Sequence, residues 1–380
     1  MFTRREGVRR ALVAYLGLAK VQRRSFAQTV AGLGAVQMDP MRVVAPAHLL
    51  TIRLRRGPTS ETAFSRALSA GSLVEVRLKE RCIIASQDLP AAAARFARAR
   101  ARRQLADRGL EGVASEILAA LARGPRFSRQ IGSEHRVASF WDEDPRSMKA
   151  TTMALDILAE EGRVIVTARR RGERRYDLPD RMFPQMEHTV AEPATTRLFA
   201  ALHYGRTMGL FRASDPYLGW SGDEARGRRQ VVEDMLARRA WVELRIDDVD
   251  QTYLCASEFA ELLEDPPTVR GVRLLSPLDN LLWDRRRLRD VFDFEYTWEA
   301  YTPATRRKVG PYGMPVLLDG RLIGEVDARR DVLGVLRWRL VERQAVRVSD
   351  RRRIGRAVDR LAADLGVQAA PVQQVELSRR

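Results

Sequence analysis

Two similar successions of segments follow each other in the middle of the chain, and this repeat limits the possible folds more than any other feature. In the first, residue spacing predicts helices over 113–123, 128–132 and 147–161, then a hairpin over 163–178. In the second, it predicts helices over 195–204, 212–217 and 223–239, then a hairpin over 241–255. Three helices followed by a hairpin is the order of a winged helix, so tandem winged-helix units are expected. The N-terminal part is interpreted as a third copy with insertions.

The pattern changes after Pro266 and Pro267. Strands are predicted over 272–275, 292–298, 314–318, 322–327 and 332–340, then an amphipathic helix over 350–365 and a loose polar tail from Gln368. The expected fold class is α+β, with three tandem winged-helix units and a small C-terminal β-barrel. The expected domains are the first unit at 1–108, the second at 109–186, the third at 187–268 and the barrel with the terminal helix at 269–380.

The chain carries 66 Lys and Arg against 49 Asp and Glu, a formal net charge of +17, which is typical of proteins that meet a polyanion. The first predicted hairpin concentrates arginines around Gly172, at Arg163, Arg169, Arg170, Arg171, Arg174 and Arg175. It is either a wing that contacts DNA or a solvated turn. The second hairpin is acidic, so its unit is interpreted as a scaffold. Two arginine runs, 285–287 and 351–353, are more typical of solvated faces than of DNA contacts.

Several classes of protein are excluded or disfavoured by what the sequence lacks. No apolar run approaches 18 residues and the N-terminus does not resemble an export signal, so a cytoplasmic, nucleoid-associated protein is expected. Cys82 and Cys255 lie too far apart in the sequence to suggest a disulfide framework or a cysteine zinc site. There is no phosphate-binding glycine loop, no nucleophile elbow and no zinc-protease motif. No metal and no organic cofactor are expected.

One pair of polar residues remains as a candidate for chemistry. Gln37 and Asp39 lie on a short predicted strand over 35–39, where alternation sends both side chains to one face and Met38 to the other. A carboxylate beside an amide can orient a water molecule, accept its proton and stabilise a cationic sugar, as hydrolysis of a glycosidic bond requires. The alternative is that the two residues only cap a turn at the end of the strand.

The surrounding residues resemble the AlkZ/YcaQ-type winged-helix DNA glycosylase family. Residues 33–48, LGAVQMDPMRVVAPAH, resemble its catalytic segment, and 275–285, LSPLDNLLWDR, resemble its C-terminal signature. The segments FEY at 294–296, EAYTP at 299–303 and GRLIG at 320–324 are similar as well. The resemblance implies a monofunctional glycosylase that releases bulky N7-alkylguanine adducts and unhooks interstrand crosslinks, with Asp39 as base and cation stabiliser and Gln37 orienting the water. One branch of the family, linked to self-resistance against a crosslinking natural product, has glutamine at the position of Asp39. The aspartate here therefore resembles the broader YcaQ-like branch.

The expected partner is double-stranded DNA containing alkylated or crosslinked guanine, bound by a monomeric protein. The first hairpin corresponds by this resemblance to the one the family places in the minor groove. The DNA-binding candidates are Arg42, His48, Arg53, Lys149, Arg169, Arg170, Arg171, Arg174 and Arg175. For His48, a structural role is an equal alternative. The alternative function is a non-catalytic winged-helix DNA-binding protein such as a transcription regulator, although no dimerisation stretch is evident.

Overall fold

The same succession of elements occurs three times in the computed structural model, which describes residues 1–132, 136–138, 148–184, 193–220 and 225–372. Each copy contains a helix, a short strand, two further helical segments and a hairpin. The short strand pairs with the last strand of the hairpin in each sheet, giving the orders β2-β4-β3, β5-β9-β8 and β10-β12-β11. In the third sheet the N-terminal strand β1 (Phe2–Thr3) adds in parallel beside β11. The N-terminal copy therefore has the same strand order as the two copies that the sequence repeat predicts.

The bounds of these elements follow the chain. The first copy comprises α2 (Phe26–Leu33), β2 (Ala35–Gln37), α3 (Ala47–Arg56), α4 (Glu61–Ser69), β3 (Leu73–Arg77) and β4 (Arg81–Ala85). The helices η1 (Ser86–Ala92), α5 (Ala93–Ala101) and α6 (Gln104–Asp107) connect it to the second copy. The second comprises α7 (Glu111–Ala122), β5 (Arg126–Phe127), η2 (Ser128–Gln130), α8 (Ala150–Glu160), β8 (Ile165–Arg170) and β9 (Glu173–Asp177), with the small pair β6 (Arg136–Val137) and β7 (Met148–Lys149). The third comprises α10 (Pro193–Met208), β10 (Leu210–Phe211), η4 (Leu218–Trp220), α11 (Ala225–Ala237), β11 (Trp241–Ile246) and β12 (Tyr253–Ala256).

An open five-stranded sheet forms the C-terminal part, in the order β13-β14-β15-β16-β17. Its strands are β13 (Val272–Leu274), β14 (Gly313–Leu318), β15 (Arg321–Arg330), β16 (Leu336–Glu342) and β17 (Ala369–Pro371). The long helix α14 (Val348–Asp364) covers it and shares its apolar core. Because β13 and β17 do not pair in the described chain, the predicted barrel is present only as this open sheet. The predicted tail begins with a strand at β17, and 373–380 lie outside the described residues.

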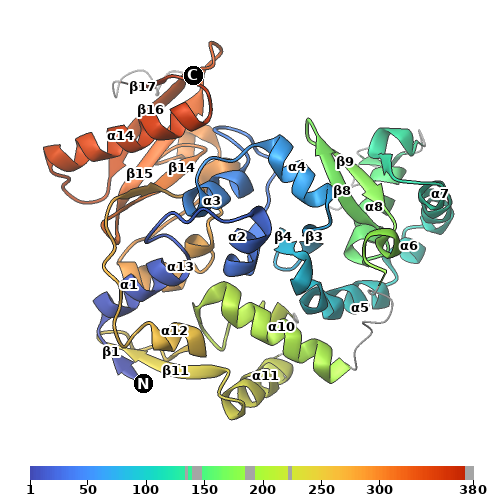
Figure 1. Cartoon of the computed structure of the whole chain (residues 1–380), viewed down its shortest axis with the longest axis horizontal. Helices are drawn as coiled ribbons and strands as arrows, with labels where there is room; N and C mark the ends of the chain where they lie inside the picture. Colours follow the sequence, from blue (N-terminus) through green and yellow to red (C-terminus); the bar gives the residue numbers. More distant parts are fainter. Residues whose placement is uncertain (133–135, 139–147, 185–192, 221–224, 373–380) are drawn as a thin grey trace.

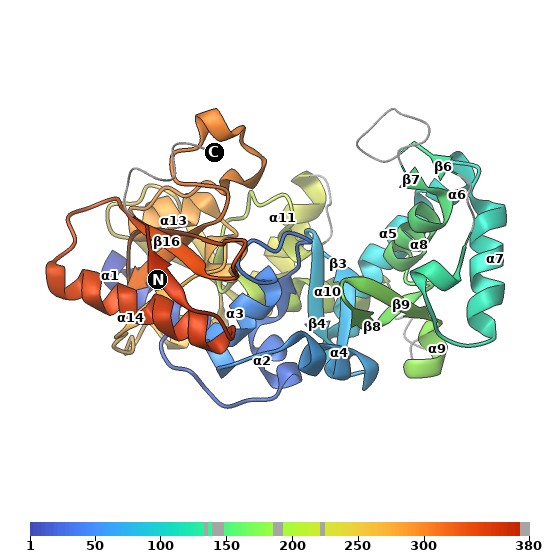
Figure 2. The same cartoon turned by 90° about the horizontal axis from the view of Figure 1, so that it is seen from above.

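The first copy lies in the middle of the molecule. Figure 1 shows α2, α3 and α4 between the C-terminal sheet with α14 on one side and α7, α8 and the β8–β9 hairpin on the other. The third copy, with α10, α11 and β11, lies below them, and the view from above keeps the same side-by-side order (Figure 2). The first helix, α1 (Arg5–Tyr15), packs mainly outside the first copy, because its buried face joins a core with Leu244, Phe259 and Leu275.

Two predicted elements are wrong for local reasons. Residues 212–217 are a turn rather than a helix, since the Asp215 carboxylate accepts the Tyr217 N–H at 2.8 Å. Residues 292–298 are not a strand: α13 (Arg285–Phe292) ends at Asp293, whose φ is 50°. The buried Phe294 and Tyr296 alternate with exposed residues without pairing to a neighbouring strand. The period-2 pattern therefore reflects burial alone.

The helix α2 and the strand after it are placed by a few residues. Ser25 and Gln28 form a capping box at the start of α2. Gly34, with φ of 71°, ends it, and a Cβ there would lie 2.1 Å from Thr207 Oγ1 on α10. Only glycine therefore fits this tight crossing, which sends the chain directly into β2. Across the residues that are described, no helix is long and apolar enough to span a membrane.

Candidate active site

Gln37 is the last residue of β2 and Asp39 lies two residues beyond it, so the strand is shorter than the predicted 35–39. The strand pairs with β4 through Gln37, and the Met38 N–H still donates to the Arg81 carbonyl at 2.8 Å, which keeps the backbone extended. Met38 is 6% exposed in a core with Val36, whereas Gln37 and Asp39 are half-buried. Both polar side chains line one cavity, so the two groups are brought together.

This cavity, of about 700 Å³, is built from three parts of the chain. The first copy contributes the end of β2 and the start of β4, and the second contributes the tip of the β8–β9 hairpin. The C-terminal part contributes two aromatic residues, Trp298 and Tyr301, from the loop that follows α13. The lining residues are Gln37, Met38, Asp39, Pro40, Arg42, Pro46, His48, Glu61, Phe64, Arg77, Glu80, Arg81, Arg169, Gly172, Arg174, Trp298 and Tyr301.

Asp39 has one oxygen engaged and one available. Its Oδ1 accepts the Met41 N–H at 2.7 Å, which is the turn-capping bond of the alternative interpretation. Within the described residues, neither Asp39 Oδ2 nor the Gln37 amide has a hydrogen-bond partner. Burial raises the pKa of Asp39 above its usual value, and the bond from Met41 opposes that shift. Asp39 thus caps a turn and can also hold a water molecule together with Gln37.

The cavity is bordered by arginines that already have acidic partners. Arg169 binds Glu75 through Nε and Nη2 at 2.5 and 2.8 Å, and Arg174 binds Asp156 at 2.6 Å. Arg81 shares Asp156 at 3.2 Å. These pairs attach the β8–β9 hairpin to β3 and α8, so much of its charge is neutralised within the protein.

The remaining arginines of the hairpin differ in their surroundings. Arg175 donates to Thr167 Oγ1 at 3.1 Å, and the Arg170 guanidinium lies 4.4 Å from the centre of the Phe127 ring. Arg170 and Arg171 are exposed, and Arg171 occupies the tip of the hairpin with φ of 49°. Arg170 and Arg171 therefore face solvent, Arg169 and Arg174 are paired with β3 and α8, and Arg175 binds within the hairpin, so the contact of this wing with DNA stays a prediction.

The sequence of the chain matches one family over most of its length. The model of the family described as "DNA glycosylase AlkZ-like" covers residues 30–363, which include Gln37, Asp39 and the whole cavity lining. The chain belongs to the AlkZ-like DNA glycosylase family. Among solved structures it is similar to the Streptomyces sahachiroi DNA glycosylase AlkZ, with a TM-score of 0.68 and 16% identity, covering 98% of this chain and 100% of that one. At this identity the likeness shows the shared fold.

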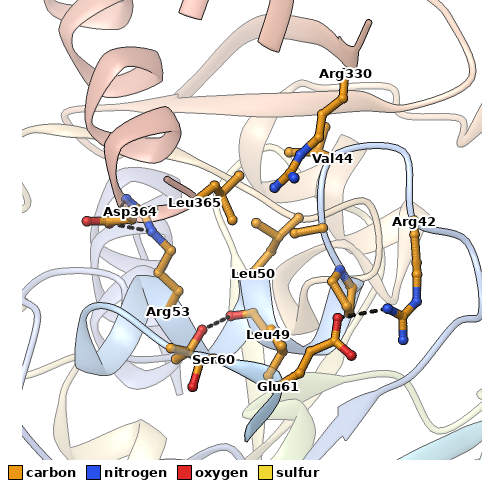
Figure 3. Close-up of a pocket in the computed structure, with 13 residues that line it drawn as sticks. Arg42, Val44, Leu49, Leu50, Arg53, Ser60, Glu61, Arg330, Asp364 and Leu365 are labelled. Atoms are coloured by element: carbon orange, nitrogen blue, oxygen red, sulfur yellow. Dashed lines mark hydrogen bonds and ion pairs between the residues drawn. The ribbon is translucent and has the colours of Figure 1, made fainter. Parts of the chain in front are cut away.

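A second cavity of about 360 Å³ adjoins the first in this AlkZ-like protein, since Arg42, Pro46 and Glu61 line both. Figure 3 shows the Arg330 guanidinium extending from the end of β15 over Leu50 and Leu365. Arg330 is exposed, and its guanidinium has no ion pair or hydrogen bond within the described residues. No local pattern distinguishes Arg330 in the sequence; the end of β15 lies beside the segment before α3, where the Arg330 backbone N–H donates to the Val43 carbonyl at 3.4 Å.

The other basic candidates lie in different places. Arg42 binds Glu61 at 2.7 Å on the border of the two cavities, and Arg53 Nε binds Asp364 at 2.7 Å at the far end of the second (Figure 3). Lys149, on β7, lines neither cavity. No group of three His, Cys, Asp or Glu residues that could hold a metal ion occurs in the ranges that the structure describes.

A residue of the C-terminal signature hydrogen-bonds to the backbone of β2 and so helps to position the strand. Asn280, 1% exposed, donates from Nδ2 to the Ala35 carbonyl at 2.8 Å, on the strand that leads to Gln37. Arg287 is fully buried and donates to the carbonyls of Met208, Leu210, Asn280 and Leu281. The interpretation of the run 285–287 as a solvated face is therefore wrong for Arg287. Asn280 of the signature thus joins the C-terminal part to β2, and Arg287, two residues after the signature, joins it to α10.

His48 lines the cavity as a buried side chain, and its contact with DNA stays a prediction. It is 5% exposed, and its ring lies 4.8 Å from that of Phe64. Burial, and then the nearby positive charge of Arg169, lower the pKa of His48 to about 3. His203 on α10 is also buried; its Nδ1 accepts the Trp220 indole N–H at 2.8 Å. Burial and then Arg206 lower its pKa to about 3 as well.

These two histidines predict how stability depends on pH. Each has a folded pKa below its usual 6.5, so its contribution is complete above pH 6.5 and is lost as the pH falls towards 3. Between pH 6.5 and 5 we expect the unfolding free energy to fall by up to about 1.4 kcal/mol per pH unit for each histidine. Urea unfolding at pH 7, 6 and 5 measures this. The double variant His48→Gln with His203→Gln should flatten the curve, and an unchanged slope would contradict the assignment.

Proposed function

We propose that this chain is a monofunctional DNA glycosylase that hydrolyses the N-glycosidic bond of bulky N7-alkylguanine and unhooks interstrand crosslinks in double-stranded DNA. The observation that carries the proposal is the pair Gln37 and Asp39, whose available polar atoms share one cavity within an AlkZ-like glycosylase fold. Its volume of about 700 Å³ falls within the range of roughly 300–1,000 Å³ for small-molecule sites.

The reaction requires little from the protein besides this pair. N7-alkylguanine is cationic, so the electrons of the C1′–N9 bond neutralise the departing base and no acid is needed to protonate it. The water oxygen bonds to C1′, and its proton moves to Asp39, whose negative charge also stabilises the oxocarbenium-like sugar. The Gln37 amide accepts the second water hydrogen bond and orients the nucleophile. No step calls for a metal or an organic cofactor.

We further propose how the chain holds DNA. The three copies are winged-helix units, which the shared strand order supports. The first unit begins at α2 rather than at residue 1, because α1 packs mainly against the third copy and the C-terminal part. The other boundaries are those expected from sequence, and the one at 186/187 lies outside the described residues. The exposed Arg170 and Arg171, with Arg42 and Lys149, contact phosphates, while Arg53, Arg169, Arg174 and Arg175 hold the surface in shape and His48 walls the cavity. The protein acts as a monomer on the DNA of the cytoplasmic nucleoid.

A single-turnover assay tests the proposal. Purified protein is mixed in excess with duplex DNA containing one N7-methylguanine, or separately one nitrogen-mustard crosslink, and alkaline cleavage reports abasic sites. Abasic sites from both substrates support the full proposal. Release from the monoadduct alone removes the crosslink activity and keeps the glycosylase. Tight DNA binding with no release from either substrate would favour the non-catalytic DNA-binding protein.

Arg330 offers a quantitative test of where the DNA backbone lies. Because its guanidinium is exposed and unpaired within the described structure, it can neutralise one phosphate beside the catalytic cavity. Arg330→Ala should weaken binding to every duplex alike and reduce the slope of log K against log salt concentration by about 0.9. Fluorescence anisotropy at four salt concentrations measures the slope.

Arg352→Ala is the matched control for Arg330→Ala. Arg352 is also exposed, but it lies near the start of α14, about 18 Å along the helix from Asp364 at the second cavity. Its loss should leave the salt slope unchanged. Equal slopes for the two variants would show that the backbone does not cross the second cavity.

A further inference from the structure

Two aromatic side chains form one wall of the catalytic cavity without a role in the chemistry described above. Trp298 and Tyr301 line it on the side of the C-terminal part. Their ring centroids lie 5.6 Å apart at 78°, so Trp298 supports Tyr301 edge to face. Tyr301 is nevertheless 76% exposed, so its ring is open to a partner that enters the cavity.

The loop that carries Tyr301 is held firmly from within. Glu299, 7% exposed, accepts the backbone N–H groups of Lys308, Val309 and Gly310 at 2.8, 2.9 and 3.0 Å. Although burial raises the pKa of Glu299, these three bonds lower it overall, as expected for an ionised brace. Arg307 ties the loop again by donating to the Thr302 carbonyl at 2.8 Å. An exposed ring on a braced loop loses little entropy when it binds a partner.

The charges around the ring indicate what that partner carries. The cavity arginines Arg42, Arg77, Arg81, Arg169 and Arg174 each bind an acidic side chain of the protein. Asp39 has no ion pair within the described residues, and its charge acts on the Tyr301 hydroxyl, whose pKa is raised by burial, by Asp39 and by Glu80. A planar cation entering the cavity thus meets an unpaired carboxylate and an electron-rich ring face.

We propose that Tyr301, backed by Trp298, stacks on the cationic alkylated base and lets the site distinguish it from neutral guanine. This rests on the proposed glycosylase function and assigns the recognition of the lesion to residues outside the Gln37 and Asp39 pair. Apolar substituents at N7 extend the contact with the ring, so bulky adducts gain the most. Tyr301 is thereby a specificity-determining residue. Its aromatic ring provides the stacking, so the hydroxyl group is not required for the preference.

The test compares binding to three duplexes that differ at one base. They contain guanine, N7-methylguanine on a 2′-fluoroarabino sugar that resists hydrolysis, or 7-deaza-7-methylguanine, which has a similar shape without the charge. Tyr301→Ala should lower the preference for the cationic base over guanine by about 5- to 30-fold. Its effect on the neutral 7-deaza base should be smaller. Tyr301→Phe should keep the preference of the wild type.

Leu333→Ala is the control, because Leu333 is 81% exposed at the turn between β15 and β16 and does not line either cavity. An unchanged preference in Tyr301→Ala, or an equal loss of affinity for all three duplexes, would overturn the proposal. Base release by the wild-type protein is measured separately. A wild type that releases no base contradicts the proposed function, while the ratio of affinities still decides the role of Tyr301.

Discussion

Asp39→Asn should lower the single-turnover rate of base release by about 10²–10⁴-fold while DNA binding stays near that of the wild type. The amide retains an oxygen that can accept the Met41 N–H, so the turn at the end of β2 is preserved. It carries no negative charge, however, and can neither take the proton of the attacking water nor stabilise the cationic sugar. The rate is measured on N7-methylguanine duplex, and the affinity on undamaged duplex of the same sequence.

Glu80→Gln is the matched control, since Glu80 lines the same cavity and the substitution removes the same charge. Its rate should stay within about threefold of the wild type, because screening weakens exposed charges that do not touch the reacting atoms. Equal losses in the two variants would show a general electrostatic effect of the cavity. Full activity in Asp39→Asn would contradict the assignment of Asp39.

The raised pKa of Asp39 predicts the pH dependence of activity and of stability. The base must be ionised, so the rate should fall at low pH with an apparent pKa above 3.8, the ordinary value for aspartate. Folding favours the protonated carboxyl, so a contribution to stability that exists below the unfolded pKa is lost as the pH rises through the folded pKa. Asp39→Asn should therefore be at least as stable as the wild type at pH 7, which separates its loss of activity from unfolding.

Asp279→Ala should lower the free energy of unfolding by about 3–5 kcal/mol. Asp279 is fully buried, and both of its oxygens bind the guanidinium of Arg55, which is 5% exposed. Removing the carboxylate leaves a positive charge in the core between α3 and the C-terminal signature, without a partner of opposite sign. Urea unfolding at pH 7, followed by tryptophan fluorescence, measures the difference.

The double variant Arg55→Met with Asp279→Leu decides whether the buried charge is the cause. Replacing a whole buried ion pair by apolar residues of similar size is often close to neutral, so this variant should recover most of the stability. A double variant as unstable as Asp279→Ala would instead indicate that the lost hydrogen bonds, such as that from the Leu281 N–H to Asp279, are responsible. Stability in Asp279→Ala equal to the wild type would contradict the account.

Local patterns predicted what local physics controls. The alternation of Gln37, Met38 and Asp39 predicted which side chains share a face. The repeat predicted most helices and both hairpins of the two central copies. Each of these features depends on residues within about a dozen positions of one another.

Ion pairs and hydrogen bonds between residues that are far apart in sequence could not be predicted from local patterns. The arginines of the β8–β9 hairpin were predicted to be free for DNA, but Glu75, which binds Arg169, is 94 residues away in sequence. Arg287 was interpreted as one of three solvated arginines, but it is buried and donates to four backbone carbonyl groups, two of which, in Met208 and Leu210, are far away in sequence. A buried arginine and an exposed one have the same local sequence signal, because their difference lies in tertiary contacts.

The identity of the released product tests the central claim most directly. After a single turnover with N7-methylguanine duplex, mass spectrometry of the small-molecule fraction and denaturing electrophoresis of the DNA, before and after alkali, are read together. We predict free N7-methylguanine in amounts equal to the abasic sites, a backbone that stays intact until alkali is added, and neither product with Asp39→Asn. No free base from the wild-type protein, under conditions in which it binds the duplex, would contradict the account.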